Sequence, residues 1–256
     1  MEMQQKVVLV TGGSSGVGQA TAVVFGRQGI RVIVTGRNSK GLDETVEHVR
    51  QAGGVAQKIT ADISEPNDIQ RMIEQALAVY GQLDILVNNA GTQGEVAPLV
   101  DQRLASFQEV FDTNVRSVFL CMKYAIPHLL NQRGAIVNIA SGGGLVGVPG
   151  ASVYCASKHA VIGMTKVAAL DYATAGLRVN AVCPGGVDTP MLQRFFESIP
   201  DPDARRQARE EFNATHPIGR IAKPEEVAAA VVFLCSPDAA FITGTTLSVD
   251  GGYVAH

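Results

Sequence analysis

Lys6-Val-Val-Leu-Val-Thr-Gly-Gly-Ser-Ser-Gly-Val-Gly18 is the stretch of this chain that decides its fold. It begins with a short apolar run rich in β-branched residues, which is typical of a buried strand. Residues 19–29 follow with apolar positions at helical spacing and end at a glycine, as helices often do. A glycine loop between a strand and a helix lets backbone N–H groups and the helix N-terminus hold a pyrophosphate. The stretch therefore predicts a nucleotide-binding site.

The alternation of strand-like and helical patterns continues along the whole chain. Strands are predicted at Lys6–Thr11, Arg31–Thr35, Val55–Thr60, Ile85–Asn88, Ala135–Ala140, Leu177–Cys183 and Thr245–Val249, and helices near Gly16–Gln28, Lys40–Ala52, Pro66–Tyr80, Gln102–Gln132, Ser152–Ala175, Pro190–Thr215 and Pro224–Cys235. The strand runs are nearly continuous in Val, Ile and Leu, as a sheet buried on both faces requires. With right-handed crossovers, this predicts an α/β fold: a Rossmann-type, doubly wound, seven-stranded parallel sheet with helices on both faces, in one domain over residues 1–256.

Composition excludes several classes of partner. The chain has 24 acidic and 21 basic side chains without a basic stripe, so we expect no nucleic-acid partner. No apolar segment approaches the roughly 18 residues of a membrane span. The start, Met1-Glu-Met-Gln-Gln-Lys6, leads straight into the first strand and is expected to leave no room for a signal peptide. The cysteines lack C-x-x-C spacing, so we expect reduced buried thiols, no metal and a cytoplasmic location.

Tyr154 and Lys158 are spaced so that they face the same way on a helix, with Cβ atoms roughly 5–6 Å apart. A phenol has an ordinary pKa near 10, and an adjacent ammonium lowers it. Lowering it by about three units takes roughly 4 kcal/mol, so a second positive group, such as an oxidised nicotinamide, is expected nearby. Ser141 ends a strand at the carboxyl edge of the sheet, where its hydroxyl can hold a substrate oxygen. Taken alone, the Tyr–Lys pair is more typical of two exposed side chains on a helix, and the other motifs reverse that interpretation.

Together these motifs resemble the short-chain dehydrogenase/reductase family in its single-domain form, over almost the whole chain. The motifs are Thr11-Gly-x-x-x-Gly-x-Gly18, Asp62, Asn88-Asn-Ala-Gly91, Asn114, Ser141, Tyr154-x-x-x-Lys158 and Pro184-Gly-Gly-Val-Asp-Thr189. The divergent enoyl-reductase branch spaces its Tyr and Lys more widely, but position 161 here is Val161. The resemblance implies Tyr154 as general acid and base, Ser141 and Lys158 as its partners, and Asn114 as holder of a proton-relaying water. It also implies a homotetramer assembled through the helices at 102–132 and 152–175.

The resemblance and the glycine loop together predict the cofactor contacts. These are Gly12, Ser14, Ser15, Gly16, Val17, Gly18, Arg37, Asp62, Ile63, Asn88, Ala90, Gly91, Tyr154, Lys158, Pro184, Gly185, Val187 and Thr189. An NAD site usually places an acid about 20 residues beyond the loop, on the ribose hydroxyls. Here Gly36 and Arg37 occupy that place, and guanidinium suits a phosphate in charge and geometry. NADP is therefore favoured over NAD, with use of both left open.

The substrate-pocket walls are predicted from position along the chain. They are Gly143, Leu145, Val146, Val148, Val153, Gly186, Met191 and Phe195, without an evident anion-binding Arg or Lys. Residues 190–215 combine aromatics with many charges and correspond in the resemblance to a lid over the site, although an ordinary surface hairpin fits as well. We expect a small neutral, hydrophobic alcohol or ketone as substrate. The alternatives are a 3-oxoacyl carrier-protein reductase and a nucleotide-binding sensor without turnover.

Overall fold

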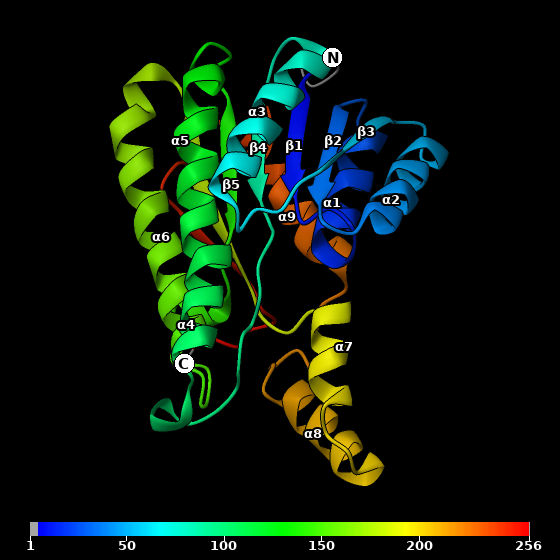
Figure 1. Cartoon of the computed structure of the whole chain (residues 1–256), viewed down its shortest axis with the longest axis vertical. Helices are drawn as coiled ribbons and strands as arrows, with labels where there is room; N and C mark the ends of the chain where they lie inside the picture. Colours follow the sequence, from blue (N-terminus) through cyan, green and yellow to red (C-terminus); the bar gives the residue numbers. More distant parts are fainter. Residues whose placement is uncertain (1–4, 256) are drawn as a thin grey trace.

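The predicted strands form a single parallel sheet (Figure 1). The computed structural model describes residues 5–255, so the predicted absence of a leader before Gln5 lies outside the described residues. The strands are β1 Val7–Thr11, β2 Arg31–Gly36, β3 Val55–Thr60, β4 Ile85–Asn88, β5 Ala135–Ile139, β6 Arg178–Pro184 and β7 Thr246–Val249, in the order β3-β2-β1-β4-β5-β6-β7. The doubly wound, seven-stranded fold is confirmed, and the strand ends differ from the predicted ones by a residue at most.

Helices cover both faces of this sheet (Figure 1). They are α1 Gly16–Arg27, α2 Ser39–Gln51, α3 Pro66–Tyr80, α4 Leu104–Phe111, α5 Ser117–Leu130, α6 Ser152–Tyr172, α7 Pro190–Glu197, α8 Pro202–Ala214 and α9 Pro224–Cys235. Val7 and Leu9 pack into the core under α3, α5 and α6. Val8 and Val10 point to the opposite core, under α1, α2 and α9. Successive residues of a strand face opposite ways, so an unbroken apolar run fills both cores.

Two predicted long helices are interrupted: the unbroken helix at 102–132 was wrong, whereas the break in 190–215 falls at Pro200-Asp-Pro202, where two prolines interrupt the helical pattern. The helix predicted at 102–132 consists of α4 and α5 joined by a π-helical turn, Asp112–Arg116. The segment 190–215 is divided into α7 and α8, because Asp201 caps α8 by accepting a hydrogen bond from Ala204 N at 2.9 Å. Short 3₁₀ turns occur at Leu99–Asp101, Gly142–Gly144, Ala173–Ala175 and Pro237–Ala239. Within residues 5–255, none of the helices combines the length and apolar character needed to span a bilayer.

The four cysteines are buried and free, as predicted. Cys121 and Cys235 lie in the two helical layers, and burial raises the pKa of each thiol to about 12. Thiols with so high a pKa are protonated at neutral pH and react slowly. Their role in the described structure is packing.

The order of the strands reverses between β1 and β4, and a crevice forms there at the carboxyl ends. Leu9 of β1 pairs with Ile33 on one side and Leu86 on the other. Gly12 follows β1 with φ of 64°, and a Cβ there would lie 2.8 Å from Ala90 Cα. A Cβ on Gly18 would overlap the Gly12 carbonyl oxygen. Glycine at 18 therefore lets α1 pack against the loop and direct its N-terminus into the crevice.

Replacing Gly18 by alanine should lower the free energy of unfolding by about 1–3 kcal/mol, because backbone must move to admit the methyl group. Urea unfolding monitored by circular dichroism measures the change. Gly147→Ala is the matched control, since nothing lies within 4 Å of a Cβ at that position. The control should alter stability by less than about 1 kcal/mol, in the stabilising direction. Equal destabilisation by both substitutions would contradict the packing role of Gly18.

Candidate active site

A cavity of about 490 Å³ opens at the carboxyl edge of the sheet. It is lined by the segments that follow β1 to β6, and by α7 and α8, which project beyond that edge (Figure 1). The predicted site residues in its lining are Gly12, Ser14, Ser15, Gly16, Val17, Arg37, Asp62, Ile63, Ala90, Gly91, Ser141, Gly143, Val148, Tyr154, Lys158, Pro184, Gly185, Gly186, Val187, Thr189 and Met191. One cavity thus brings together most of the residues that the sequence singles out.

The glycine loop is held against the end of β4 by reciprocal hydrogen bonds. Asn89 Nδ2 donates to the carbonyl oxygens of Thr11 and Gly12, at 2.9 and 3.1 Å. Thr11 Oγ1 accepts from the backbone N–H groups of Asn89 and Ala90, at 3.0 and 3.1 Å. The Ser15 side chain makes no hydrogen bond that caps α1, so the first N–H groups of that helix have no side-chain cap. These groups are suited to a bound anion.

Two predicted cofactor contacts lie outside the cavity lining. Gly18 faces the loop backbone. Asn88 is buried in the sheet, where its Nδ2 donates to Asn138 Oδ1 at 2.8 Å. Asn138 in turn donates to Thr165 Oγ1 on α6 at 2.9 Å. Asn88 therefore joins β4, β5 and α6, which agrees with a role in stabilising the central sheet.

Ser141, Tyr154 and Lys158 all line the cavity. Ser141 lies just beyond β5, and its Oγ accepts from Gly143 N at 3.1 Å, a bond that uses the oxygen and not the hydroxyl hydrogen. Lys158 is only 4% exposed, and its Nζ donates to Ile139 O at 2.9 Å. The same Nζ lies 5.7 Å from the centroid of the Tyr154 ring. The main chain at the end of β5 therefore fixes the ammonium beside the phenol.

Burial shifts both titrating groups of α6 towards their neutral forms. It raises the pKa of Tyr154, while the Ser141 side chain acts in the opposite direction. It lowers the pKa of Lys158 to about 8. The net direction for Tyr154 is opposite to the lowering expected from its spacing to Lys158, because desolvation outweighs the hydrogen bond from Ser141. A further positive charge is needed to lower the pKa of Tyr154, as the sequence argument anticipates.

Asn114 lies in the π-helical turn and is 1% exposed. Its Oδ1 accepts from Thr92 N, and its Nδ2 donates to Thr92 O, both at 2.8 Å. Nδ2 also donates to Ser157 Oγ at 3.0 Å. A Cβ on Gly91 would lie 3.2 Å from Asn114 Oδ1 and 3.4 Å from Lys158 Nζ, so the two groups converge behind that glycine. Asn114 is outside the cavity lining and orders the backbone and helix around it, as π turns at functional sites do.

Arg37 and Asp62 lie at the far end of the cavity and pair with each other. Arg37 Nη1 is 3.6 Å from Asp62 Oδ2, and the Arg37 side chain is 77% exposed. Burial raises the pKa of Asp62, but the hydrogen bonds from Ser64 and the charge of Arg37 together lower it by more. The net pKa is therefore below its usual value. The guanidinium is thus held near the cavity by a weak, largely solvated ion pair.

The substrate end differs in part from the predicted one. Val146, Val153 and Phe195, with Leu145, are outside the lining. Val153 is buried within α6, and Phe195 packs edge-on against Phe196, with ring centroids 5.3 Å apart. The lining includes residues that the sequence argument missed, namely Asn89, Thr92, Gln93, Thr113, Ala151, Leu192, Arg194, Phe212, His216 and Tyr253. Arg194 is a cation that the predicted walls lacked.

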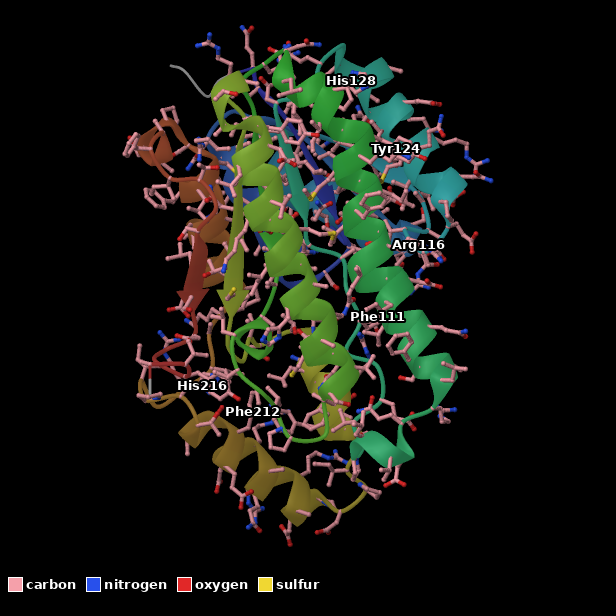
Figure 2. The ribbon with its side chains drawn as sticks, turned by 90° about the vertical axis from the view of Figure 1, so that its left-hand side faces the viewer. Phe111, Arg116, Tyr124, His128, Phe212 and His216 are labelled. Atoms are coloured by element: carbon pink, nitrogen blue, oxygen red, sulfur yellow. The ribbon has the colours of Figure 1, made fainter. Side chains whose placement is uncertain are left out.

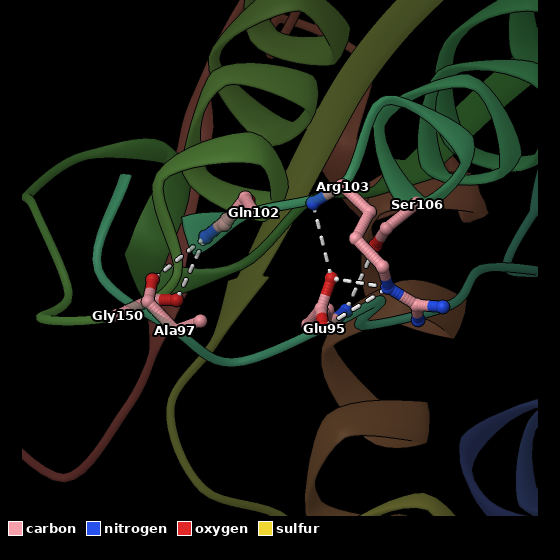
Figure 3. Close-up of polar contacts among 6 residues, drawn as sticks. All are labelled: Glu95, Ala97, Gln102, Arg103, Ser106 and Gly150. Carbon is pink, nitrogen blue, oxygen red and sulfur yellow. Dashed lines mark hydrogen bonds and ion pairs between the residues drawn. The ribbon is translucent and has the colours of Figure 1, made fainter. Parts of the chain in front are cut away.

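The loop that carries Val148 is fastened by the segment after β4 (Figure 3). Gln102 Nε2 donates to Ala97 O and Gly150 O, both at 3.0 Å. Ala97 N also donates to Gly150 O at 2.9 Å. Alongside, the Glu95 carboxylate accepts from the backbone N–H and Nε of Arg103 at 3.2 Å (Figure 3). These contacts join two segments distant in sequence and set the position of one pocket wall.

Comparison with known proteins places this architecture in a family. A family model described as Enoyl-(Acyl carrier protein) reductase matches residues 12–254. A cyclohexanol dehydrogenase of Acinetobacter sp. (strain SE19) is 40% identical over 99% of this chain and 97% of that protein. A 2,5-dichloro-2,5-cyclohexadiene-1,4-diol dehydrogenase of Sphingobium indicum is 43% identical over 99% of each chain. A cis-4-hydroxycyclohexanecarboxylate dehydrogenase of Sinomonas cyclohexanicum is 39% identical over 98% of this chain and 97% of that protein.

Solved structures agree with these relatives. Levodione reductase superposes with a TM-score of 0.95 at 34% identity, over 99% of each chain. A variant of actinorhodin polyketide ketoreductase with NADPH gives a TM-score of 0.94 at 38% identity, over 98% of each chain. The chain belongs to the short-chain dehydrogenase/reductase family and is an oxidoreductase of that family.

Proposed function

We propose that this protein interconverts a neutral, cyclic secondary alcohol and the corresponding ketone, with NADP favoured over NAD. The observation that carries the proposal is the convergence of Ser141, Tyr154 and Lys158 in a cavity that also contains an uncapped helix N-terminus. A nucleotide sensor has no need of that catalytic set. The relatives named above act on ring alcohols, which supports a cyclic substrate.

The residues present fit a nicotinamide dinucleotide. The N-terminus of α1 would hold the pyrophosphate, and the segment after β3, with Asp62 and Ile63, would lie beside adenine. Lys158 would hold the nicotinamide ribose, and Val187 and Thr189 the carboxamide. A bound nicotinamide supplies the hydride for reduction or accepts it in oxidation.

The proton chemistry follows from the geometry of the catalytic set. The Ser141 hydroxyl, whose bond to Gly143 N uses only its oxygen, donates its hydrogen to the substrate oxygen and stabilises developing negative charge. Tyr154 protonates that oxygen in reduction and takes the proton back in oxidation. Lys158 is held by Ile139 O and favours the phenolate. Asn114 positions the backbone of Thr92 and the start of a proton path towards Lys158.

Apolar and aromatic side chains dominate the substrate end. Val148, Met191, Phe212 and Tyr253 line it, with residues 190–215 acting as the lid. The carrier-protein alternative requires a free basic patch on that lid. Arg205 donates to Ile199 O at 2.9 Å, Arg206 pairs with Asp203 at 3.0 Å, and Arg209 stacks 5.0 Å from the Phe196 ring centroid. These contacts disfavour the alternative.

We further propose a cytoplasmic homotetramer. Phe119 on α5 is 51% exposed, and Val167 and Leu170 on α6 are 57% and 80% exposed. Large apolar side chains gathered on neighbouring helices favour burial against another copy.

Tyr154→Phe should lower kcat by at least about 10²-fold, because the proton donor is lost, while cofactor affinity changes little. Turnover is followed by reduced nicotinamide absorbance, with cyclohexanol and cyclohexanone as probes. Tyr172→Phe, at the other end of α6, is the control and should retain activity. Near-normal kcat in Tyr154→Phe would remove the proposed mechanism.

The substrate prediction is a higher kcat/KM for cyclohexanol than for cis-4-hydroxycyclohexanecarboxylate, because burying a carboxylate against apolar walls is costly. Arg194 is the lining cation at this end that would reverse the order. If the acid is preferred, Arg194→Gln should abolish the preference. A preference for the acid that survives Arg194→Gln would show that the pocket has been misassigned.

The wild-type protein should bind NADP more tightly than NAD, by roughly ten- to a hundredfold, as a charged hydrogen bond of about 1.5–3 kcal/mol allows. Gly36→Asp with Arg37→Ile should reverse that order, since the acid binds free ribose hydroxyls and repels a phosphate. A Cβ at Gly36 has ordinary contacts only, the nearest 3.7 Å from Ser14 Oγ. Dissociation constants for both cofactors and both proteins decide the matter. Tighter NAD binding by the wild type would mean that Arg37 remains paired with Asp62 and does not bind a phosphate.

A further inference from the structure

His216 is a buried histidine at the junction of three segments of the cavity wall. It follows α8, it is 3% exposed, and it lines the cavity together with Phe212 (Figure 2). Its ring stacks on Tyr253 near the C-terminus, with centroids 5.4 Å apart and planes 26° apart. It also contacts Gly186, in the segment after β6. The proposed mechanism assigns this histidine no role.

The hydrogen bonds of its ring determine its protonation state. Nε2 lies 2.8 Å from Gly186 N, and a backbone N–H can only donate, so Nε2 must carry a lone pair. Nδ1 lies 3.0 Å from Phe212 O, and a carbonyl oxygen can only accept, so Nδ1 must carry the hydrogen. The Thr215 hydroxyl, 3.2 Å from Nδ1, donates its own hydrogen to Phe212 O and so leaves this assignment unchanged. The ring is therefore the neutral Nδ1–H tautomer. A second proton would direct Nε2–H at Gly186 N–H and break the bond between α8 and the β6 segment.

The junction is too tightly packed to absorb that change by a small shift. A Cβ on Gly185 would lie 2.8 Å from His216 Nε2, and one on Gly186 would lie 2.5 Å from Phe212 Cε1. Tyr253, on which the His216 ring stacks, also packs against Gly142, the residue after Ser141. A Cβ on Gly142 would lie 3.1 Å from Tyr253 Cδ1. The imidazole is thus a link between the lid, the Pro184–Thr189 segment and the residue after Ser141.

The charged groups around the junction have other partners. Asp250 borders the junction, since a Cβ on Gly185 would lie 3.0 Å from its Cα. Its carboxylate accepts from the N–H groups of Gly252 and Val254, both at 3.0 Å. Arg220, beyond the histidine, pairs with Glu226 at 2.7 Å. On the lid, Arg209 stacks on Phe196, and on the β6 side Asp188 accepts from Gln193 at 3.2 Å. Within residues 5–255, no carboxylate lies within 4.0 Å of the His216 ring to stabilise an imidazolium.

We propose that neutral His216 is a positioning residue that fastens the lid to the Pro184–Thr189 segment, and that its protonation releases the lid. The closed arrangement is compatible only with a neutral imidazole. The hydrogen bond from Gly186 N–H to His216 is therefore present at alkaline pH and is lost as pH falls. Release of the lid is expected to weaken substrate binding in acid, and this consequence rests on the proposed function. The opening itself does not.

Amide hydrogen exchange tests the opening without any substrate. Wild type and His216→Gln are compared at about pH 8 and about pH 5.5, because a solvent-exposed imidazole changes charge between these values. The Gln carboxamide oxygen can accept from Gly186 N–H and does not titrate. The ratio of the wild-type to the variant exchange rate over residues 184–215 cancels the intrinsic effect of pH. It should rise at least about fivefold in acid, the ratio that corresponds to about 1 kcal/mol.

His216→Phe and His48→Gln complete the set. The phenylalanine keeps an aromatic ring but loses the acceptor, so it should show fast exchange at both pH values. His48 is exposed on α2 and its variant should follow the wild type. Should His216→Phe fail to fold, the glutamine variant still decides the matter. Parallel pH profiles for wild type and His216→Gln would overturn the proposal.

Kinetics then connect the link to the reaction. With cyclohexanol as probe, the wild-type KM relative to that of His216→Gln should rise at least about fivefold between about pH 8 and about pH 5.5, while the ratio of kcat values changes less. An unchanged KM ratio beside the expected exchange result would overturn the effect on substrate binding. If neither cofactor supports turnover of cyclohexanol or cyclohexanone, the proposed function fails and the exchange result stands independently.

Discussion

The covering of both sheet faces by helices is the constraint on which the rest of the molecule depends. Val8, Leu9 and Val10 of the central strand β1 are fully buried, so this strand carries no side chain along its length that a ligand could reach. Polar groups can reach a ligand only where strands end, and in a parallel sheet all the carboxyl ends lie at one edge. The position of the cavity follows from this geometry. So does its composition, because each lining segment begins where an apolar strand stops.

Burying the lysine ammonium at this edge costs desolvation free energy, and hydrogen bonds from the surrounding structure offset part of that cost. Lys158 is almost wholly buried, and burial lowers the pKa of its ammonium to about 8. Its bond to Ile139 O holds the charge at a defined point. Asn114 and Asn138 order the neighbouring strands and helices through side-chain hydrogen bonds. Such networks are stable only when their members are paired, and they make the site rigid before any ligand arrives.

The substrate side is built on a different principle. Here α7, α8 and the C-terminal segment meet through aromatic contacts that run from Phe195 through Phe196, Phe212 and His216 to Tyr253. The helices on this side are amphipathic and carry many charges on their exposed faces. A wall of this kind can vary its shape without disturbing the sheet, which separates substrate choice from the catalytic set.

The sequence by itself determined the strands, their faces and the order of the motifs, because continuous apolar runs and glycine spacing are local properties. That was enough to identify the family and to predict Ser141, Tyr154 and Lys158 in one cavity. It was not enough for the π turn at Asn114, since a break in a long apolar helix depends on a hydrogen bond to Thr92. Nor did it find His216 or the pairing of Arg37 with Asp62. Those features join segments far apart in the chain, and only tertiary structure decides which distant groups a side chain meets.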